Sequence, residues 1–284
     1  RAEVQNSTVV FQLNISNNIN FCASKSRPNA KPRNVTSNNF EKMTKKIIFI
    51  FLIIISTISI SFFAQSKKTK VEDERFVTFI VNPKKQNVEF YWKNAKGENF
   101  KNVENLKLWL KKNKKVLIFG TNGGMYKKDN SPQGLYIENG KKKMEIDTTK
   151  GNGNFYLKPN GIFYISVDKK PNICLTEKFI ENKNINFATQ SGPMLVIDGN
   201  IHSAFQKNSV NLNIRNGIGI LPNNEIVFAM SKKEINFYEF AEYFKELGCK
   251  NALYLDGFVS RTYLPEKNWI QTDGNFGVII GVSK

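Results

Sequence analysis

The chain has 284 residues, 40% of them hydrophobic and 12% aromatic, which is typical of a globular protein with a sizeable core. It carries 42 Lys and Arg residues against 24 Asp and Glu residues, a net charge of +18, and this excess favours acidic partners over basic ones. A single histidine, His202, excludes a metal site built from several histidines, so any chemistry is expected to rest mainly on carboxylates, Arg, Asn, hydroxyls and backbone N–H groups.

The first 64 residues differ in composition from the rest of the chain. Residues 1–42 are rich in Asn and Ser and show no period, which indicates a disordered or upstream extension. Residues 43–64 join a short basic segment to a long apolar run (IIFIFLIIISTISISFFA), and this order predicts a signal peptide or, if it is not cleaved, a signal anchor. Residues 65–284 are then the folded domain, which we expect to be exported as a periplasmic, secreted or membrane-anchored protein.

Export bears on the two cysteines of this domain. Cys174 and Cys249 could form a disulfide in an oxidising compartment. They could equally be two buried free thiols, because the sequence does not show whether their Cα atoms come within bonding reach.

The domain opens with strand and helix signals. Residues 76–81 (FVTFIV) and 88–92 (VEFYW) are predicted to be paired strands around a turn. Residues 102–113 are predicted to be an amphipathic helix, because apolar residues recur at spacings of three and four and lysines gather in the last turn.

A glycine-rich turn follows the next predicted strand, residues 116–120 (VLIFG). The turn contains Asn122, Gly123 and Gly124. Paired glycines let backbone N–H groups converge on an anion, since no Cβ blocks its approach, and Asn122 adds an amide donor and acceptor. The turn is therefore a candidate binding segment, with an ordinary structural turn as the alternative.

Another polar cluster lies in the middle of the chain. Residues 155–157 and 162–167 are predicted to form a hairpin around a Pro-Asn-Gly turn. Gln190, Ser191 and Gly192 follow, and they offer hydrogen-bond donors and room for close approach next to a predicted strand.

Arg215 lies in residues 211–220, a strand pattern that is otherwise apolar and rich in glycine. A guanidinium does not lose its proton, so its burial requires an anion. Asp256 could supply that anion in a structural ion pair, or a bound phosphate could supply it.

The last third of the chain contains the clearest helix. Residues 226–230 are predicted to be a strand, and residues 236–247 a helix, because Asn236 and Glu239 form a capping pattern before an aromatic stripe. Residues 275–282 are predicted to be the final buried strand.

A carboxylate stands at the exit of the buried strand predicted in residues 251–256. Gly257 lets the backbone turn directly after Asp256, and Ser260 and Arg261 add a hydroxyl and a guanidinium to the same loop. Asp256 either caps a turn or a following helix, or it contributes to a site in which these groups act together.

Short strands dominate, two helices intervene, and each polar motif follows a strand. These features predict an α+β fold with mixed or antiparallel sheets, two main helices and motif loops that converge at one rim.

Four of these segments, in this order, resemble the phosphodiester glycosidase family over residues 75–282. The matching segments are Thr121-Asn122-Gly123-Gly124, Gln190-Ser191-Gly192-Pro193, Ile214-Arg215-Asn216-Gly217-Ile218-Gly219, and the helix of residues 236–247 followed by Asn251 to Asp256. No single segment is specific, but the order of the four is. One departure is Phe258-Val259, which stands where the family carries two further glycines after Asp-Gly.

The resemblance implies hydrolysis at a sugar C1 whose leaving group is a phosphate monoester. A phosphate leaves more readily than an alkoxide, so one carboxylate could suffice where glycosidases ordinarily use two. Our hypothesis gives catalytic roles to Asp256, which would activate water or stabilise an oxocarbenium-like centre, and to Arg215, which would grip the phosphate. The candidate substrate-binding residues are Asn122, Gly123, Gly124, Gln190, Ser191, Gly192, Ser260 and Arg261.

The expected partner is a phosphorylated sugar or an anionic glycan. No nucleic-acid-reading motif is present, and contact with a membrane would come only through an uncleaved signal anchor. No cofactor is expected, although a divalent cation stays open. Two other functions remain as alternatives: a non-catalytic exported module that binds an anionic or phosphorylated glycan, and a phosphodiesterase that cleaves the P–O bond.

Overall fold

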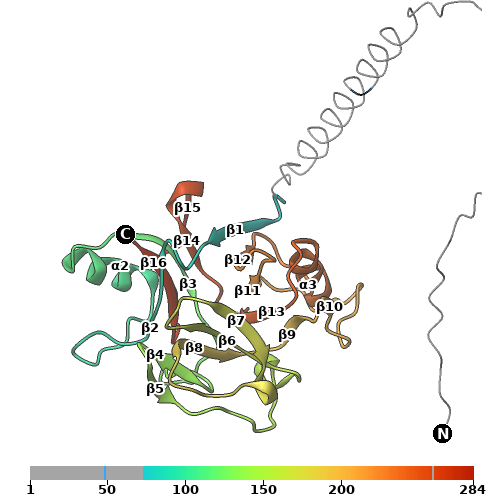
Figure 1. Cartoon of the computed structure of the whole chain (residues 1–284), viewed down its shortest axis with the longest axis horizontal. Coiled ribbons are helices and arrows are strands. Elements are labelled where there is room, and N and C mark those ends of the chain that lie inside the picture. Colours follow the sequence, from blue (N-terminus) through green and yellow to red (C-terminus); the bar gives the residue numbers. More distant parts are fainter. Residues whose placement is uncertain (1–47, 49–72, 258) are drawn as a thin grey trace, which may run out of the picture. The chain divides into compact units, whose positions relative to one another are not determined.

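The structure of the protein is a computed structural model that describes residue 48 and residues 73–257 and 259–284. Residues Glu72–Lys284 form a compact unit (Figure 1). Apart from Ile48, the predicted extension and signal segment lie outside the described residues. Within the described part of the chain, no helix combines the length and apolar character needed to cross a bilayer.

The first sheet places Asp256 at the end of one of its central strands. Its neighbouring strands are antiparallel, and their order is β1 (Phe76–Val81), β12 (Ile226–Ser231), β11 (Asn216–Ile220), β13 (Ala252–Asp256), β9 (Met194–Ile197) and β10 (Asn200–Ile201). All six residues of β12 are buried, so its unbroken apolar run reflects burial on both faces of the sheet.

The second sheet contains the strand that leads into the glycine-rich turn. Its order is β15 (Trp269–Ile270), β14 (Thr262–Leu264), β3 (Leu117–Asn122), β16 (Ile279–Ser283) and β2 (Asn87–Tyr91). The predicted pairing of the first two strands is wrong, because β1 pairs with β12 and β2 pairs with β16. A local apolar pattern identifies a strand but does not choose its partner, which here depends on strands far along the chain.

The third sheet carries Gln190 and Ser191 at the end of its central strand. Its order is β5 (Lys141–Met144), β4 (Tyr136–Glu138), β8 (Ile185–Ser191), β6 (Gly161–Ser166) and β7 (Pro171–Leu175). The predicted hairpin is shifted: β6 pairs with β7, and the expected strand over residues 155–157 is a 3-10 turn, Asn154–Tyr156. Gly153 and Pro159 flank that short run and leave it too few residues to extend as a strand.

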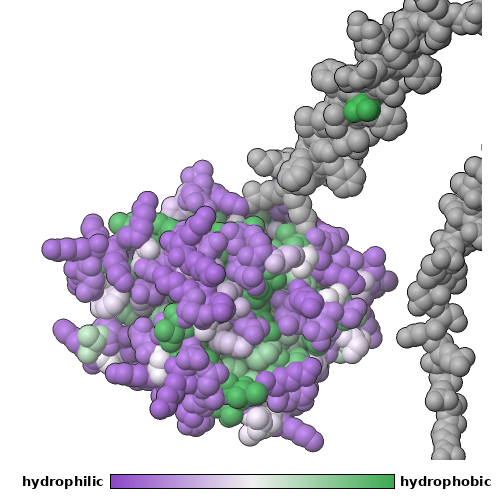
Figure 2. Space-filling model, viewed as in Figure 1, coloured by the Kyte–Doolittle hydropathy of each residue, from purple (hydrophilic) through white to green (hydrophobic). Residues whose placement is uncertain are grey.

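The three sheets share one hydrophobic core. It includes Phe79 of β1, Phe119 of β3, Phe163 of β6, Leu253 of β13 and Ile280 of β16. Phe79 and Phe119 stack with their ring centroids 4.4 Å apart, which joins the first sheet to the second. Figure 2 shows that hydrophilic residues dominate the outer face in that view, with apolar patches between them.

Two α-helices within residues 73–284 each cover one sheet. Helix α2 (Val103–Lys112) buries Val103, Leu106 and Leu110 beside the second sheet, and Asn102 caps it by accepting a hydrogen bond from the Asn105 N–H. Helix α3 (Phe237–Glu246) buries its aromatic stripe against the first sheet. Its expected cap is confirmed, since the side chain of Asn236 accepts a hydrogen bond of 2.9 Å from the Glu239 N–H.

The arrangement of helices and antiparallel sheets confirms the α+β prediction. Of the two alternatives for the cysteines, the disulfide between Cys174 and Cys249 is not formed; Cys249 is buried and Cys174 is partly buried. Burial raises the pKa of the Cys174 thiol to about 11, so this cysteine is a poor nucleophile at neutral pH. His202 is buried, and its Nε2 lies 3.0 Å from the Lys158 carbonyl oxygen.

Candidate functional site

Strand ends from all three sheets meet near Asp256. Strand β3 ends at Asn122, β8 ends at Ser191, β11 begins at Asn216 and β13 ends at Asp256. Asn216 and Asp256 are register partners across β11 and β13, and the Ser191 hydroxyl donates a hydrogen bond of 2.9 Å to the Leu255 carbonyl. Segments that lie far apart in the sequence are thereby brought to one rim of the sheets.

Asn216 joins strands β3 and β13 at this rim through its side chain, and the sequence did not indicate this role. Its side chain is 1% exposed, and its Nδ2 donates to the Thr121 hydroxyl (3.1 Å) and to the carbonyl and side-chain oxygens of Asn122 (3.1 and 3.0 Å). Its Oδ1 accepts from the Asp256 N–H at 2.8 Å. One amide therefore fixes Asp256 relative to β3, although in the sequence Asn216 is only a polar residue beside a glycine.

Asn122 presents a buried hydrogen-bond donor at this rim. Its Oδ1 accepts from Asn216 Nδ2 and from the Arg261 backbone N–H (3.0 Å), and these two donors fix which end of the amide is oxygen. Its Nδ2 is buried and has no hydrogen-bond partner among the described residues. An unpaired buried donor costs about 1–3 kcal/mol, so this NH2 group is suited to a bound oxygen that comes from outside the chain.

Asp256 carries a partly buried carboxylate with no cation paired to it among the described residues. Its Oδ1 accepts a hydrogen bond of 2.6 Å from the Gly257 N–H. Burial disfavours the charged form and raises the pKa of Asp256 to about 6, while the Gly257 hydrogen bond acts in the opposite direction. A carboxyl group with a pKa this close to neutrality can exchange protons with a substrate or a water molecule.

Gly257 is needed for close approach and not for a turn with positive φ. A Cβ at this position would lie 1.9 Å from the Tyr254 hydroxyl oxygen and 3.2 Å from the carbon that bears it. The tyrosine hydroxyl therefore occupies the space of a side chain at residue 257. The chain does bend at Gly257, as the sequence predicted, and the contact with Tyr254 adds a steric reason for the glycine.

Arg215 is completely buried and is not paired with Asp256. Its Nε donates to the Ile235 carbonyl (2.8 Å), and its Nη2 donates to the carbonyl and side-chain oxygens of Asn211 (2.8 and 3.2 Å). Its guanidinium carbon lies 3.6 Å from the centre of the Phe237 ring, so the cation stacks on an aromatic face. Two anions were expected as partners of Arg215, the Asp256 carboxylate and a bound phosphate. The ion pair with Asp256 is not present among the described residues.

Two buried polar atoms here form no hydrogen bond of ordinary geometry among the described residues, although the guanidinium and the phenol interact with each other. They are Nη1 of Arg215 and the hydroxyl of Tyr254. A bidentate interaction with a phosphate needs two guanidinium nitrogens with free N–H groups. The bonds to Ile235 and Asn211 occupy Nε and Nη2, so only Nη1 is left. Burial lowers the pKa of Arg215 and raises that of Tyr254, which keeps the phenol neutral.

Arg261 lies in the same loop, but its guanidinium is engaged by an acid. Nε and Nη2 donate to the two carboxylate oxygens of Asp273 at 2.8 and 2.9 Å. The ion pair holds the pKa of Asp273 below its ordinary value. Ser260 is buried, and its hydroxyl donates to the Asp256 carbonyl (3.0 Å), so both residues brace the loop that follows Asp256. Val259 packs on the cluster under α2, whereas residue 258 lies outside the described residues.

The glycines of the turn after β3 pack against protein atoms. The Gly123 N–H donates to the Val278 carbonyl (2.8 Å), and its carbonyl accepts from the Thr189 hydroxyl (2.9 Å). A Cβ on Gly123 would lie 2.8 Å from side-chain atoms of Val278 and Ile280. Gly124 has φ +145, where L side chains are strained. The backbone of Gly123 is thus not available to an anion.

The polar cluster at the end of β8 is also engaged internally. Gln190 accepts from the backbone N–H groups of Leu135 (2.9 Å) and Asp147 (2.8 Å), and it donates to the Asp147 carbonyl (2.6 Å). A Cβ on Gly192 would lie 2.6 Å from the side chain of Asn160. These residues hold the loops beside Asp256 in place, and the contacts leave them little freedom to bind a ligand directly.

Tyr126 is a neighbour that the sequence did not indicate. Its hydroxyl donates to the Asn275 carbonyl. Burial raises its pKa, and the negative charge of Asp256 raises it further, which places the phenol within electrostatic reach of the carboxylate. Only its position two residues after Gly124 could have suggested it.

No group of three or more His, Cys, Asp and Glu residues that could hold a metal ion is present among the described residues. Asp256 is therefore not part of such a cluster in the described structure. Its neighbours at the rim carry amide, hydroxyl and phenol groups.

Comparisons with known proteins give one family match and one curated relative. A family model described as phosphodiester glycosidase matches residues 115–279. The chain is 39% identical over 187 residues to the uncharacterized protein YigE of Escherichia coli (strain K12), a match that covers 66% of this chain and 73% of that protein.

Solved structures give weaker likenesses. The zebrafish N-acetylglucosamine-1-phosphodiester alpha-N-acetylglucosaminidase catalytic domain, auto-inhibited by its pro-peptide, matches with a TM-score of 0.49 and 12% identity over 75% of this chain and 84% of that one. A hypothetical protein from Synechocystis matches with a TM-score of 0.45 and 13% identity over 73% of this chain and 59% of that one.

Proposed function

The chain belongs to the phosphodiester glycosidase family, and from this premise we propose that it hydrolyses a sugar-1-phosphodiester at the bond between C1 and oxygen. The products are a reducing sugar and a phosphate monoester. The proposal is supported most directly by Asp256, a partly buried carboxylate with no cationic partner among the described residues, whose pKa of about 6 lies near neutrality.

One carboxylate is enough for this reaction because the leaving group is stabilised by its own chemistry. A phosphate monoester is a far better leaving group than a sugar alkoxide, so the general acid that most glycosidases need is dispensable. Ionised Asp256 removes a proton from water as the water oxygen bonds to C1. The bond from C1 to the phosphate oxygen breaks, and its electron pair leaves with the phosphate.

Asn122 is the group best placed to bind the departing or attacking oxygen. Its Nδ2 is a buried donor that has no partner in the described part of the chain, and Asn216 holds both this amide and the backbone of Asp256. A donor that is already oriented stabilises developing negative charge without reorganising. Asn122 and Asp256 thus make up the reacting pair of this proposal.

Arg215 has a positioning role in the proposal. It anchors Asn211 and Ile235 and packs between the rings of Phe237 and Tyr254, and only Nη1 remains to act on a neighbouring group. Gln190, Ser191, Gly192, Ser260 and Arg261 likewise support the loops around Asp256. Export to the periplasm, the medium or a membrane surface is proposed from the apolar segment in residues 43–64.

The test is turnover of a panel of sugar-1-phosphodiesters that differ in the sugar, with Asp256→Asn and Arg215→Ala variants beside the wild type. We expect the wild type to release a phosphate monoester and Asp256→Asn to be about 10²–10⁴-fold slower. Activity of both variants within a few-fold of the wild type would remove the assignment. Tight binding of a panel member without product release would favour a glycan-binding module.

A further inference from the structure

A cavity lies at the end of the strands opposite to Asp256. It has a volume of about 590 Å³, within the range of about 300–1,000 Å³ that is usual for ligand sites. On β6, Gly161 pairs with Ser191 near the site, whereas Ser166 pairs with Ile185 beside the cavity. At a rise of about 3.3 Å per residue, the two ends of β6 are roughly 16 Å apart. The cavity is therefore separate from the site described above.

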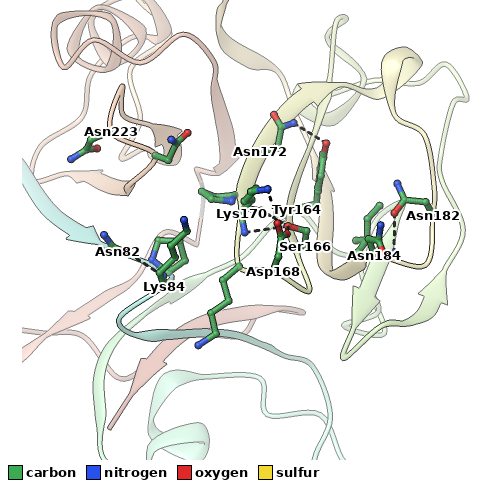
Figure 3. A pocket seen from close by; sticks show the side chains of 15 residues that line it. Asn82, Lys84, Tyr164, Ser166, Asp168, Lys170, Asn172, Asn182, Asn184 and Asn223 are labelled. Atoms are coloured by element: carbon green, nitrogen blue, oxygen red, sulfur yellow. Dashed lines mark hydrogen bonds and ion pairs between the residues drawn. The ribbon is translucent and has the colours of Figure 1, made fainter.

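Four segments surround this cavity. They are the turn after β1, the turn between β6 and β7, the residues just before β8, and the turn between β11 and β12. Figure 3 shows Asn82 and Lys84 on one side of the opening and Tyr164 and Asn172 on the other, with Asn184 beyond them. Groups that are distant in the sequence thus face a common space.

The cavity lining is positively charged. Lys84, Lys169 and Lys170 line it together with a single acid, Asp168. Asp168 is paired with Lys170 at 2.7 Å, and Lys169 Nζ donates to the side-chain oxygen of Asn87 at 3.2 Å. Lys84 has no ion-pair partner in the described part of the chain. Two cationic groups are left unneutralised, and they favour an anionic ligand.

The neutral lining suits hydroxyl groups. Asn184 and Asn224 make no side-chain hydrogen bond among the described residues, and Asn172 uses only its Nδ2, which donates to the Tyr164 hydroxyl at 2.8 Å. Amides offer both donors and acceptors, as a sugar hydroxyl requires. The other asparagines of the lining serve its turns by accepting from backbone N–H groups, and they are left out of the inference.

We propose that this cavity is a non-catalytic binding site for an anionic glycan, held by Lys84 and Lys169 through its charges and by Asn172, Asn184 and Asn224 through its hydroxyls. Binding here does not require hydrolysis at Asp256, so the proposal stands or falls independently of the proposed function. A glycan that spans both ends of the domain would be tethered at this cavity while its phosphodiester is cut elsewhere.

The experiment is calorimetric titration of the full domain at low salt with a heparin-derived tetrasaccharide, maltotetraose and tripolyphosphate as separate probes. We expect the anionic tetrasaccharide to bind at least tenfold more tightly than either of the others. Lys84→Glu/Lys169→Glu should weaken its binding at least tenfold, and Asn184→Ala/Asn224→Ala, which leaves the charge unchanged, should weaken it about threefold.

The matched control is Lys111→Glu/Lys112→Glu, which makes the same charge change on exposed residues of α2. Its affinity should stay within twofold of the wild type, and turnover of a small sugar-1-phosphodiester should be unchanged in every variant of this set. An equal loss of affinity in the two lysine double variants would mean that the tetrasaccharide binds through general surface charge, which would overturn the proposal. Tripolyphosphate bound as tightly as the tetrasaccharide, or no binding of the tetrasaccharide, would overturn it as well.

Discussion

At Asp256, burial with no cationic partner among residues 73–257 and 259–284 has opposite consequences for activity and for stability. The carboxyl must be ionised to take a proton from water, yet its surroundings disfavour the ionised form and raise its pKa to about 6. We therefore expect kcat/KM to rise with pH below about 6 and to level off above it. A pH–rate profile checks this, and a flat profile between pH 4.5 and 7.5 would contradict it.

The stability of the fold should show the reverse trend at the same residue. The folded-state pKa lies above the ordinary value of 3.8, so this carboxyl stabilises the fold at low pH and loses that contribution as pH rises through about 6. Asp256→Asn removes the cost of the buried charge. Thermal unfolding at pH 7 should therefore show a Tm a few degrees higher for the variant, and no difference near pH 3.5.

Asn216 should act on the reaction only through its neighbours. Asn216→Asp keeps the acceptor for the Asp256 N–H, loses the donors to Asn122 and Thr121, and adds a negative charge next to Asp256. A like charge raises the pKa of Asp256, so the rising limb of the pH profile should move to higher pH while kcat falls at least tenfold.

Asn251→Asp provides the matched control for this substitution. Asn251 also joins segments through its amide, by donating to the Ile173 carbonyl and accepting from the Asp198 N–H, but it lies beyond the other end of β13. We expect this variant to lose stability without shifting the pH profile. A shift of the same size in both variants would mean that Asn216 has only a structural role.

At the scale of the strand, the end of β13 depends on a contact between Gly257 and Tyr254. Gly257→Ala places a methyl group on the tyrosine hydroxyl and should cost about 1–3 kcal/mol of the free energy of unfolding. In a Tyr254→Phe background the hydroxyl is absent, so the same change should cost less than about 1 kcal/mol. Denaturant unfolding of the double-mutant cycle measures this coupling, and equal costs in both backgrounds would contradict it.

The strands that the sequence predicts most readily are those that are mainly apolar. Strands β12 and β13 are buried on both faces, and β1 is buried except at Ile80, so composition marks them. Strand β7 begins with Pro and Asn and is only partly buried, and its three apolar residues are too short a run to separate it from a loop. The partners of β1 and β2 depend on distant strands that pack into the common core, which a local pattern does not record.

The sequence predicts which residues belong to the candidate site more readily than it predicts how they are arranged. The Asp256 strand exit and the Asn122 turn are visible because a polar residue follows an apolar run. The role of Asn216 depends on hydrogen bonds to residues about 40 and 94 positions away, which no spacing reveals. Gln190 and Arg215 were expected to face a ligand, but their side chains form hydrogen bonds within the protein. These bonds could not be predicted for the same reason.

For the whole molecule, the excess of lysine should affect substrate capture and not the chemical step. A basic surface attracts an anionic phosphodiester over a distance that salt shortens, to about 10 Å at 0.1 M ionic strength. We expect KM to rise several-fold between about 0.05 and 0.5 M NaCl while kcat stays within twofold. A salt effect confined to kcat would contradict this prediction.

The central claim is that water attacks the sugar carbon and that Asp256 is the one carboxylate that takes part in the reaction, by removing a proton from that water. Hydrolysis of a sugar-1-phosphodiester in water enriched in oxygen-18, followed by mass spectrometry of both products, tests it most directly. The account predicts the label in the C1 hydroxyl of the sugar and none in the phosphate monoester. Label in the phosphate would show that the P–O bond is cut, and would contradict the account.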